Sequence, residues 1–415
     1  MASLSATVAT KGQLAHVAFS SDASHLVACT SSGLRVFSCD KLVELVFYRR
    51  NGTGDEVTCA ELLTESNLAA VIRSPNDTDG AADVYGVRFM EWRREEGDGA
   101  GCQRRRGQKQ RQTSVATKTL DTPGLGAVGG LRLLGDHMLV AGEKKAVLVV
   151  NGDGDPQDKE ERTTGPNPLG LCALATDQKT LVYALPREEK GAVQVCRSGC
   201  PDTVDVHAHD SSVACIALSP DGRLLATAGS KGTLVRIFSA DDGSKLQELR
   251  RGTDRADIHC IVFSPDSKWL AVSSDKATVH VFRVADSADL ASSTTPQSGA
   301  EQKLNAPEEG GQAAPAAAPP AESLPASASL PGAKASKGSS LSFLKGYLPS
   351  YFSSEWSLAQ FRLPEGVKYS VAFEPKNNNT ILIIGTNGSF YRCQFDPENA
   401  GDMVQLLHRK FMKIN

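Results

Sequence analysis

Residues 213–238, which read VACIALSPDGRLLATAGSKGTLVRIF, decide the fold because the same pattern returns further along the chain. Residues 258–282 read IHCIVFSPDSKWLAVSSDKATVHVF, and the Ser-Pro-Asp at 219–221 aligns with the Ser-Pro-Asp at 264–266. Weaker copies begin at Val17 and Val371. A segment that recurs at this length predicts a repeat architecture rather than a series of unrelated domains.

Each copy predicts a small antiparallel sheet. A β-rich run ends in a polar turn, a second apolar run ends in a tight turn such as Lys231-Gly232, and a third run alternates in and out. A fourth strand follows at Lys245–Arg250. Four strands in about 45 residues are typical of a β-propeller blade. Residues 56–92, 126–151 and 166–197 fit less regular copies, and seven blades of about 40 residues fit the chain.

The predicted fold is therefore all-β, a seven-bladed β-propeller with a long disordered loop in blade six. Residues 1–284 would form blades one to six, with an insert at about 95–112. Residues 285–340 are rich in Ala, Ser and Pro and have no aromatic residue, which predicts disorder because too little apolar surface is available for burial. Residues 341–362 would follow as an amphipathic membrane-inserting segment, and residues 363–415 as blade seven.

Two of these stretches have more than one interpretation. The Gly- and Arg-rich insert at 95–112 is a solvated loop, a nuclear signal or an extra phosphate-binding loop. Residues 341–356 read LSFLKGYLPSYFSSEW, which either folds back onto the propeller or inserts at the depth of lipid headgroups. Its apolar side chains recur at near-helical spacing, and we expect five to enter the membrane: Phe343, Leu344, Tyr347, Leu348 and Tyr351.

Composition and missing motifs exclude several function classes. The net charge of −3 provides no general cationic field for DNA or acidic lipid, so any anion must be bound by a local cluster. The ten cysteines form no CxxC pair, and we expect no metal site and no cofactor. The sequence also lacks the nucleophile-elbow, P-loop and HExxH patterns, which argues against an enzyme. We find neither a signal peptide nor an apolar run of the roughly 20 residues that span a bilayer.

The phrase LRRGTDR at residues 249–255 is the most specific candidate site. Successive side chains of a strand point to opposite faces, so Arg250 and Arg251 cannot serve one pocket. Guanidinium groups bind phosphate oxygens in pairs, and two arginines on opposite faces therefore suggest two phosphate sites. Composition alone favours the alternative that the arginines protect an exposed edge strand from pairing. Neighbouring repeats offer suitable donors: His209, Ser230, Thr233 and Arg236 on one side, and Ser273, Ser274, Thr278 and His280 on the other.

Several segments resemble the PROPPIN family, the seven-bladed phosphoinositide-binding propellers of autophagy. The strongest are residues 208–282, whose LRRG matches the family's Phe/Leu-Arg-Arg-Gly signature, and residues 351–366. The resemblance favours the phosphate interpretation of the arginine pair. It implies that Arg250 acts with the first four donors and Arg251 with the second four, on phosphatidylinositol 3-phosphate and phosphatidylinositol 3,5-bisphosphate. Ala277 departs from the family, which usually has Gly there.

The resemblance also implies a cellular setting. We expect a cytoplasmic, monomeric protein that binds peripherally to phosphoinositide-containing pre-autophagosomal, endosomal or vacuolar/lysosomal membranes, meets autophagy proteins through the propeller rim and binds no nucleic acid. It would act as an effector or scaffold in autophagosome formation or endolysosomal trafficking. The alternative is a generic WD-repeat scaffold that binds only proteins, although the repeats lack the regular Gly-His and Trp-Asp pairs of that class.

Overall fold

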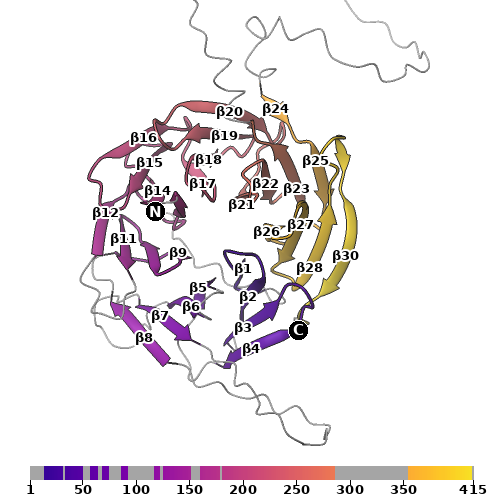
Figure 1. Ribbon diagram of the computed structural model, residues 1–415, viewed down its shortest axis with the longest axis horizontal. Helices are drawn as coiled ribbons and strands as arrows, with labels where there is room; N and C mark the ends of the chain where they lie inside the picture. Colours follow the sequence, from indigo (N-terminus) through magenta and orange to yellow (C-terminus); the bar gives the residue numbers. More distant parts are fainter. Residues whose placement is uncertain are drawn as a thin grey trace, which may run out of the picture. The chain divides into compact units, whose positions relative to one another are not determined.

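The computed structural model describes residues 14–30, 33–49, 57–63, 68–73, 86–91, 116–121, 125–150, 159–177, 180–285 and 354–413. The secondary-structure elements of these residues are all strands, and they form seven sheets of four or five strands. The sheets follow one another around a ring, each with its first strand innermost (Figure 1). The all-β propeller predicted from the repeats is confirmed.

The first four sheets each contain four consecutive strands. Their bounds are β1 His16–Phe19, β2 His25–Thr30, β3 Gly33–Ser38 and β4 Glu44–Arg49; β5 Val57–Leu63, β6 Leu68–Arg73, β7 Gly86–Glu91 and β8 Ala116–Asp121; β9 Gly130–Leu134, β10 His137–Ala141, β11 Lys145–Val150 and β12 Lys159–Thr163; β13 Ala173–Asp177, β14 Thr180–Pro186, β15 Ala192–Arg197 and β16 Thr203–His207.

The last three sheets are joined across the chain. The fifth holds β17 Val213–Leu218, β18 Leu224–Gly229, β19 Leu234–Ser239, β20 Lys245–Arg250 and β24 Glu355–Trp356. The sixth holds β21 Ile258–Phe263, β22 Trp269–Ser274, β23 Thr278–Arg283, β25 Ala359–Arg362 and β29 Gly401–Asp402. The seventh holds β26 Tyr369–Glu374, β27 Asn377–Gly385, β28 Ser389–Gln394 and β30 Val404–Lys410.

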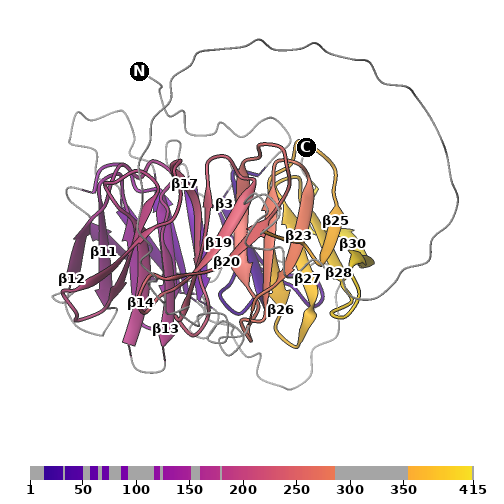
Figure 2. The same cartoon turned by 90° about the horizontal axis from the view of Figure 1, so that it is seen from above.

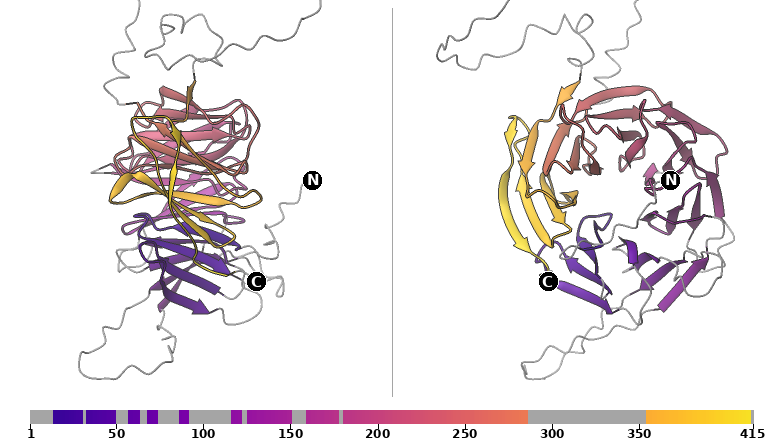
Figure 3. Two further views of the ribbon diagram at one scale, coloured as in Figure 1. Left: turned by 90° about the vertical axis from the view of Figure 1, so that its right-hand side faces the viewer. Right: turned by 180° about the vertical axis from the view of Figure 1, so that it is seen from behind.

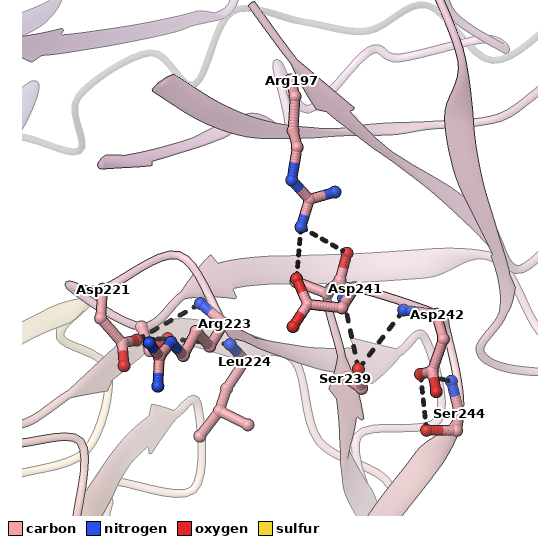
Figure 4. Close-up of polar contacts among 10 residues, drawn as sticks. Arg197, Asp221, Arg223, Leu224, Ser239, Asp241, Asp242 and Ser244 are labelled. Atoms are coloured by element: carbon pink, nitrogen blue, oxygen red, sulfur yellow. Dashed lines mark hydrogen bonds and ion pairs between the residues drawn. The ribbon is translucent and has the colours of Figure 1, made fainter. Parts of the chain in front are cut away.

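The repeated Ser-x-Asp sequence builds the same turn in several sheets. Ser264 Oγ donates to Asp266 at 2.6 Å and accepts from the Trp269 amide at 3.0 Å. Ser20 repeats both contacts with residues 22 and 25, and Ser219 repeats them with residues 221 and 224. Figure 4 shows this turn in the fifth sheet, together with Arg197, which donates to Asp241 at 2.6 Å from the fourth sheet. The motif thus fixes one end of the sheets.

Apolar side chains fill the space between neighbouring sheets, which stand face to face around the ring (Figures 2 and 3). One cluster joins the fourth and fifth sheets and includes Val206, Leu225 and Phe238. Another joins the fifth and sixth and includes Leu249 and Phe282. The first and seventh sheets share a further cluster, so burial of apolar surface also closes the ring.

Residues 286–353 lie outside the described part of the chain, as does the insert at 95–112. Residues 355–362, which the sequence assigned to the membrane-inserting segment, instead form β24 and β25 of the fifth and sixth sheets. The strands of the propeller therefore resume at residue 355, whereas the sequence predicted that they resume at residue 363. Backbone pairing of β24 with β20 and of β25 with β23 accounts for the difference.

Candidate functional site

The arginine pair lies at the end of β20. Arg250 is the last residue of the strand and pairs with Leu234 of β19, and the Arg251 amide donates to the Thr233 carbonyl at 2.9 Å. The two side chains are only 8% and 6% exposed. A guanidinium is held at such low exposure only where other groups satisfy its donors, so both side chains are parts of built environments.

Strand alternation directs the two arginines to different faces of the fifth sheet. Leu249, which precedes them, packs in the cluster between the fifth and sixth sheets. Arg250 is opposite Leu234, which lies on the same face of β19 as Phe238, and Phe238 packs against the fourth sheet. Arg251 points back toward the sixth sheet, where its charge acts on His280. The two side chains therefore lie on opposite faces of the fifth sheet, as strand alternation predicts.

The face toward the fourth sheet carries a histidine and a paired arginine, and we call it the His209 face. His209 Nε2 lies 3.0 Å from Thr227 Oγ1, while Arg236 donates to Glu248 at 2.9 Å and to the Ala208 carbonyl at 2.7 Å. Burial, aided by the nearby charge of Arg236, lowers the pKa of His209 to about 4. The imidazole is therefore neutral at pH 7 and presents a hydrogen-bonding edge rather than a charge.

Ser230 and Thr233 flank the turn between β18 and β19, and both are half-buried. The Ser230 amide donates to the Ser212 carbonyl at 2.8 Å. Thr233 supplies its carbonyl to the Arg251 amide. The turn itself depends on Gly232, whose φ of +62° lies in the left-handed region and whose position leaves no room for a Cβ beside the Ala256 carbonyl.

The face toward the sixth sheet, which we call the His280 face, holds Arg251 by backbone carbonyls. Its Nε donates to the Gly232 carbonyl at 2.8 Å and its Nη2 donates to the Asp254 carbonyl. Burial lowers the pKa of Arg251, although the charges of Asp275 and Asp254 oppose the effect. Among the described residues Arg251 forms no ion pair within 4.0 Å, although the carboxylates of Asp275 and Asp254 lie close enough to act on its charge.

His280 lies on the same face of the sixth sheet as Ser274 and Thr278. Its Nδ1 is 3.1 Å from Ser357 Oγ, and burial together with the charge of Arg251 lowers the pKa of His280 to about 4. Ser274 is 1% exposed and accepts from the Lys276 amide at 3.4 Å, while Thr278 is half-buried and donates to the Lys276 carbonyl at 3.2 Å. The structure thus brings three of the four predicted partners to the Arg251 side.

Ser273 does not join them. It alternates with Ser274 on β22, and its Oγ donates to the Tyr369 carbonyl of the seventh sheet at 2.7 Å. The side chain is 1% exposed between the sixth and seventh sheets. The alternation that separates the two arginines also separates the two serines, so Ser273 belongs to the packing of the ring.

Sequence reasoning missed three polar side chains that follow residues 286–353. Ser354 accepts a hydrogen bond from Arg250 Nε at 2.8 Å, and Ser357 contacts His280 as described above. Glu355, between them, accepts from Gln247 Nε2 of β20 at 2.8 Å. One short segment therefore contacts residues of both faces. Its sequence, SSEWS, carried part of the family resemblance, but only the pairing of β24 with β20 shows its position.

Three further points concern the membrane-inserting residues, metal sites and membrane-spanning helices. The five membrane-inserting candidates, Phe343 to Tyr351, lie outside the described residues. Within the described ranges we find no group of three or more His, Cys, Asp or Glu placed to hold a metal ion. Those ranges also contain no helix long and apolar enough to cross a bilayer.

Comparison with known proteins agrees with this arrangement. The PROPPIN family model matches residues 131–300, which include the arginine pair, the fourth sheet and strands β21 to β23 of the sixth. Autophagy-related protein 18e of Arabidopsis thaliana is 38% identical over 249 residues, which cover 60% of this chain and about half, 54%, of that relative.

Two further likenesses extend over nearly the whole chain. Autophagy-related protein 18 of Phaeosphaeria nodorum is 27% identical over 437 residues, covering 93% of this chain and 97% of the relative. A solved complex of KlAtg21 with the coiled coil of AgAtg16 matches with a TM-score of 0.63 at 18% identity, over 96% of this chain and 100% of that chain. The family model, these relatives and the propeller fold together support assignment of the chain to the PROPPIN family.

Proposed function

We propose that this protein is a peripheral membrane protein that recognises phosphatidylinositol 3-phosphate and phosphatidylinositol 3,5-bisphosphate in autophagosome formation or endolysosomal trafficking. The observation that carries the proposal is the burial of Arg250 and Arg251 on opposite faces of one sheet. Each face also holds a neutral histidine, half-buried His209 on one and buried His280 on the other. That arrangement supports two headgroup sites, one toward the fourth sheet and one toward the sixth.

The residues suit a phosphorylated inositol. The guanidinium of Arg251 is oriented by two carbonyls through Nε and Nη2, which leaves further N–H groups for phosphate oxygens. His280, Ser274 and Thr278 offer neutral donors and acceptors for ring hydroxyls. On the other face Arg250 and Arg236 supply two cations, of which Arg236 is partly neutralised by Glu248 at 2.9 Å.

Two sites on one molecule explain how a chain with a net charge of −3 would hold an anionic membrane. When one headgroup is bound, the second binds at a high effective concentration, which raises overall affinity by about 10²–10⁴. Insertion of the apolar side chains of residues 343–351 would add to this binding. That contribution is proposed from the sequence alone.

The setting is proposed from the relatives. The names of the two matched proteins, autophagy-related proteins 18 and 18e, support a role in autophagy. The structure of KlAtg21 with the coiled coil of AgAtg16 supports contacts with autophagy proteins through the propeller rim. We place the protein in the cytoplasm, acting on pre-autophagosomal, endosomal or vacuolar/lysosomal membranes.

Flotation tests the proposal. The protein should float with vesicles that contain phosphatidylinositol 3-phosphate and remain behind with pure phosphatidylcholine. The double variant R250T/R251T should not float with either. A double variant that removes two exposed or half-exposed positive charges elsewhere, R187T/R223T, controls for net charge and should float like the wild type. Equal flotation of R250T/R251T, with its thermal unfolding unchanged, would disprove the proposal.

A further inference from the structure

Trp356 is the one aromatic residue among the large hydrophobic side chains exposed in the described part of the chain, at 56% exposure. Most large apolar side chains of the ring are buried between sheets. Trp269, for comparison, is 6% exposed and packs against the Phe395 ring at 5.1 Å. A single exposed apolar side chain is ordinary on a protein surface, but this one lies on a strand that is paired with the end of β20, beside Arg250.

The backbone around Trp356 is held in place. β24 pairs in parallel with β20, so that Trp356 is level with Arg250, and β24 lies at the outer edge of the ring (Figure 1). The side chains on either side are bound inward: Ser354 to Arg250, Glu355 to Gln247 and Ser357 to His280. These three residues adjoining Trp356 in sequence are hydrogen-bonded to the propeller, while Trp356 itself remains exposed beside Arg250.

Gln247 of β20 also fixes the position of the backbone around Trp356. Its amide group donates to Glu355 at 2.8 Å and to the Arg283 carbonyl at 3.1 Å, and it accepts from the Ala285 amide at 3.1 Å. One side chain of β20 thus binds the chain directly before and directly after residues 286–353. The position of Trp356 relative to Arg250 is therefore set by the ring, independently of those residues.

We propose that Trp356 is a fixed interfacial anchor, whose indole enters the headgroup region of the phospholipid bilayer when Arg250 binds its lipid. This inference rests on the proposed function and adds a residue to it. Tryptophan prefers the membrane–water interface, because its ring is apolar while its N–H still finds a polar partner there. Trp356 is level with Arg250. When Arg250 binds a lipid phosphate at the rim, the indole is therefore brought to the depth of the headgroups.

Fluorescence provides the test, because the chain has only three tryptophans, Trp92, Trp269 and Trp356. In a W92F background, emission should shift to the blue on vesicles of phosphatidylcholine with phosphatidylinositol 3-phosphate. Phosphatidylcholine brominated on its acyl chains should quench it. Neither effect should occur in W92F/W356F, because the remaining Trp269 is buried in the ring.

Binding provides a second readout. W356A should weaken vesicle binding about tenfold without changing lipid preference, since an interfacial side chain contributes area rather than headgroup contacts. W356F should lose less because it keeps an aromatic ring, and both variants should unfold at the wild-type temperature.

The outcomes separate the two proposals. If W92F floats with the vesicles but its emission is neither shifted nor quenched, the anchor is disproved while the phosphoinositide function stands. Equal affinity of W356A and wild type would also overturn it and assign the indole to a protein contact. If the wild type fails to float with phosphatidylinositol 3-phosphate, the proposed function fails first and the anchor falls with it.

Discussion

The His209 face and the His280 face of the fifth sheet hold the same kinds of residue in different electrostatic settings. Each combines an arginine from the end of β20 with a histidine whose pKa burial lowers to about 4. On the His209 face Arg236 adds a second cation, but Glu248 pairs with it. On the His280 face the Gly232 and Asp254 carbonyls hold Arg251, and among the described residues it forms no ion pair. The His280 face therefore depends on one arginine and on the turn that orients it, whereas on the His209 face the positive charge is divided between Arg250 and Arg236.

The largest effect is expected from the turn. In G232A the new Cβ would meet the Ala256 carbonyl oxygen at 1.8 Å, and alanine is strained at a φ of +62°. We expect the free energy of unfolding to fall by about 3 kcal/mol, from left-handed strain plus a steric clash. Denaturant-induced unfolding of G232A and of the wild type measures this difference in free energy.

Gly252 provides the matched control for this substitution. It lies just beyond the arginine pair, and a Cβ there would meet no atom within 4 Å. G252A should therefore unfold like the wild type. Equal destabilisation of the two variants, or none in either, would show that the turn does not hold Arg251 in the way that we describe.

The next effect separates the two faces by ligand binding. R251A should remove about 2 kcal/mol of binding at the His280 face, the loss expected for a charge-assisted phosphate contact, or roughly 30-fold in affinity. R250A should weaken the His209 face less, because Arg236 remains there. Calorimetric titration with soluble short-chain phosphatidylinositol 3-phosphate should give two sites for the wild type and one intact site for R251A. Equal losses in both variants would contradict the asymmetry.

The arginine pair also shows how far the sequence could predict this site. The repeats at 213–238 and 258–282 predicted their strands closely, because alternation and turn residues are local signals. Alternation also predicted that Arg250 and Arg251 diverge. The same rule, applied to Ser273 and Ser274, would have placed Ser273 against the seventh sheet, where the structure has it.

Other features depended on contacts between distant residues. Nothing local in SSEWS indicates that Ser354 contacts Arg250 or that Ser357 contacts His280, since these contacts join residues 104 and 77 positions apart. The pairing of Arg236 with Glu248 was also missed. That contact is local in the sheet, but in sequence the two residues are separated by a turn and by a register shift between Ile237 and Phe238.

Acid should destabilise both faces gradually, as the pH falls. A histidine with a folded pKa of about 4 and an unfolded value of 6.5 is protonated more readily in the unfolded chain. Stability is therefore full above about pH 6.5 and is lost as the pH falls toward 4, by about 1 kcal/mol per pH unit for each histidine.

Urea unfolding at pH 7 and pH 5 measures this loss. H209Q and H280Q should each reduce the pH dependence, because glutamine keeps hydrogen-bonding groups but does not titrate. If either variant keeps the full wild-type slope, the corresponding histidine is already protonated, or equally accessible, in the folded protein.

The smallest effect runs in the opposite direction and tests the His209 face directly. E248Q removes the carboxylate that neutralises Arg236, so the local potential becomes more positive and affinity at this face should rise about threefold. The His280 face should be unchanged, because Arg251 forms no ion pair among the described residues. E44Q breaks a similar pair, Arg35 with Glu44 at 2.6 Å in the first sheet, and should leave both sites unaltered. If E248Q weakens binding instead, Glu248 serves to orient Arg236 toward the ligand, and the paired arginine would then contribute through geometry rather than through net charge.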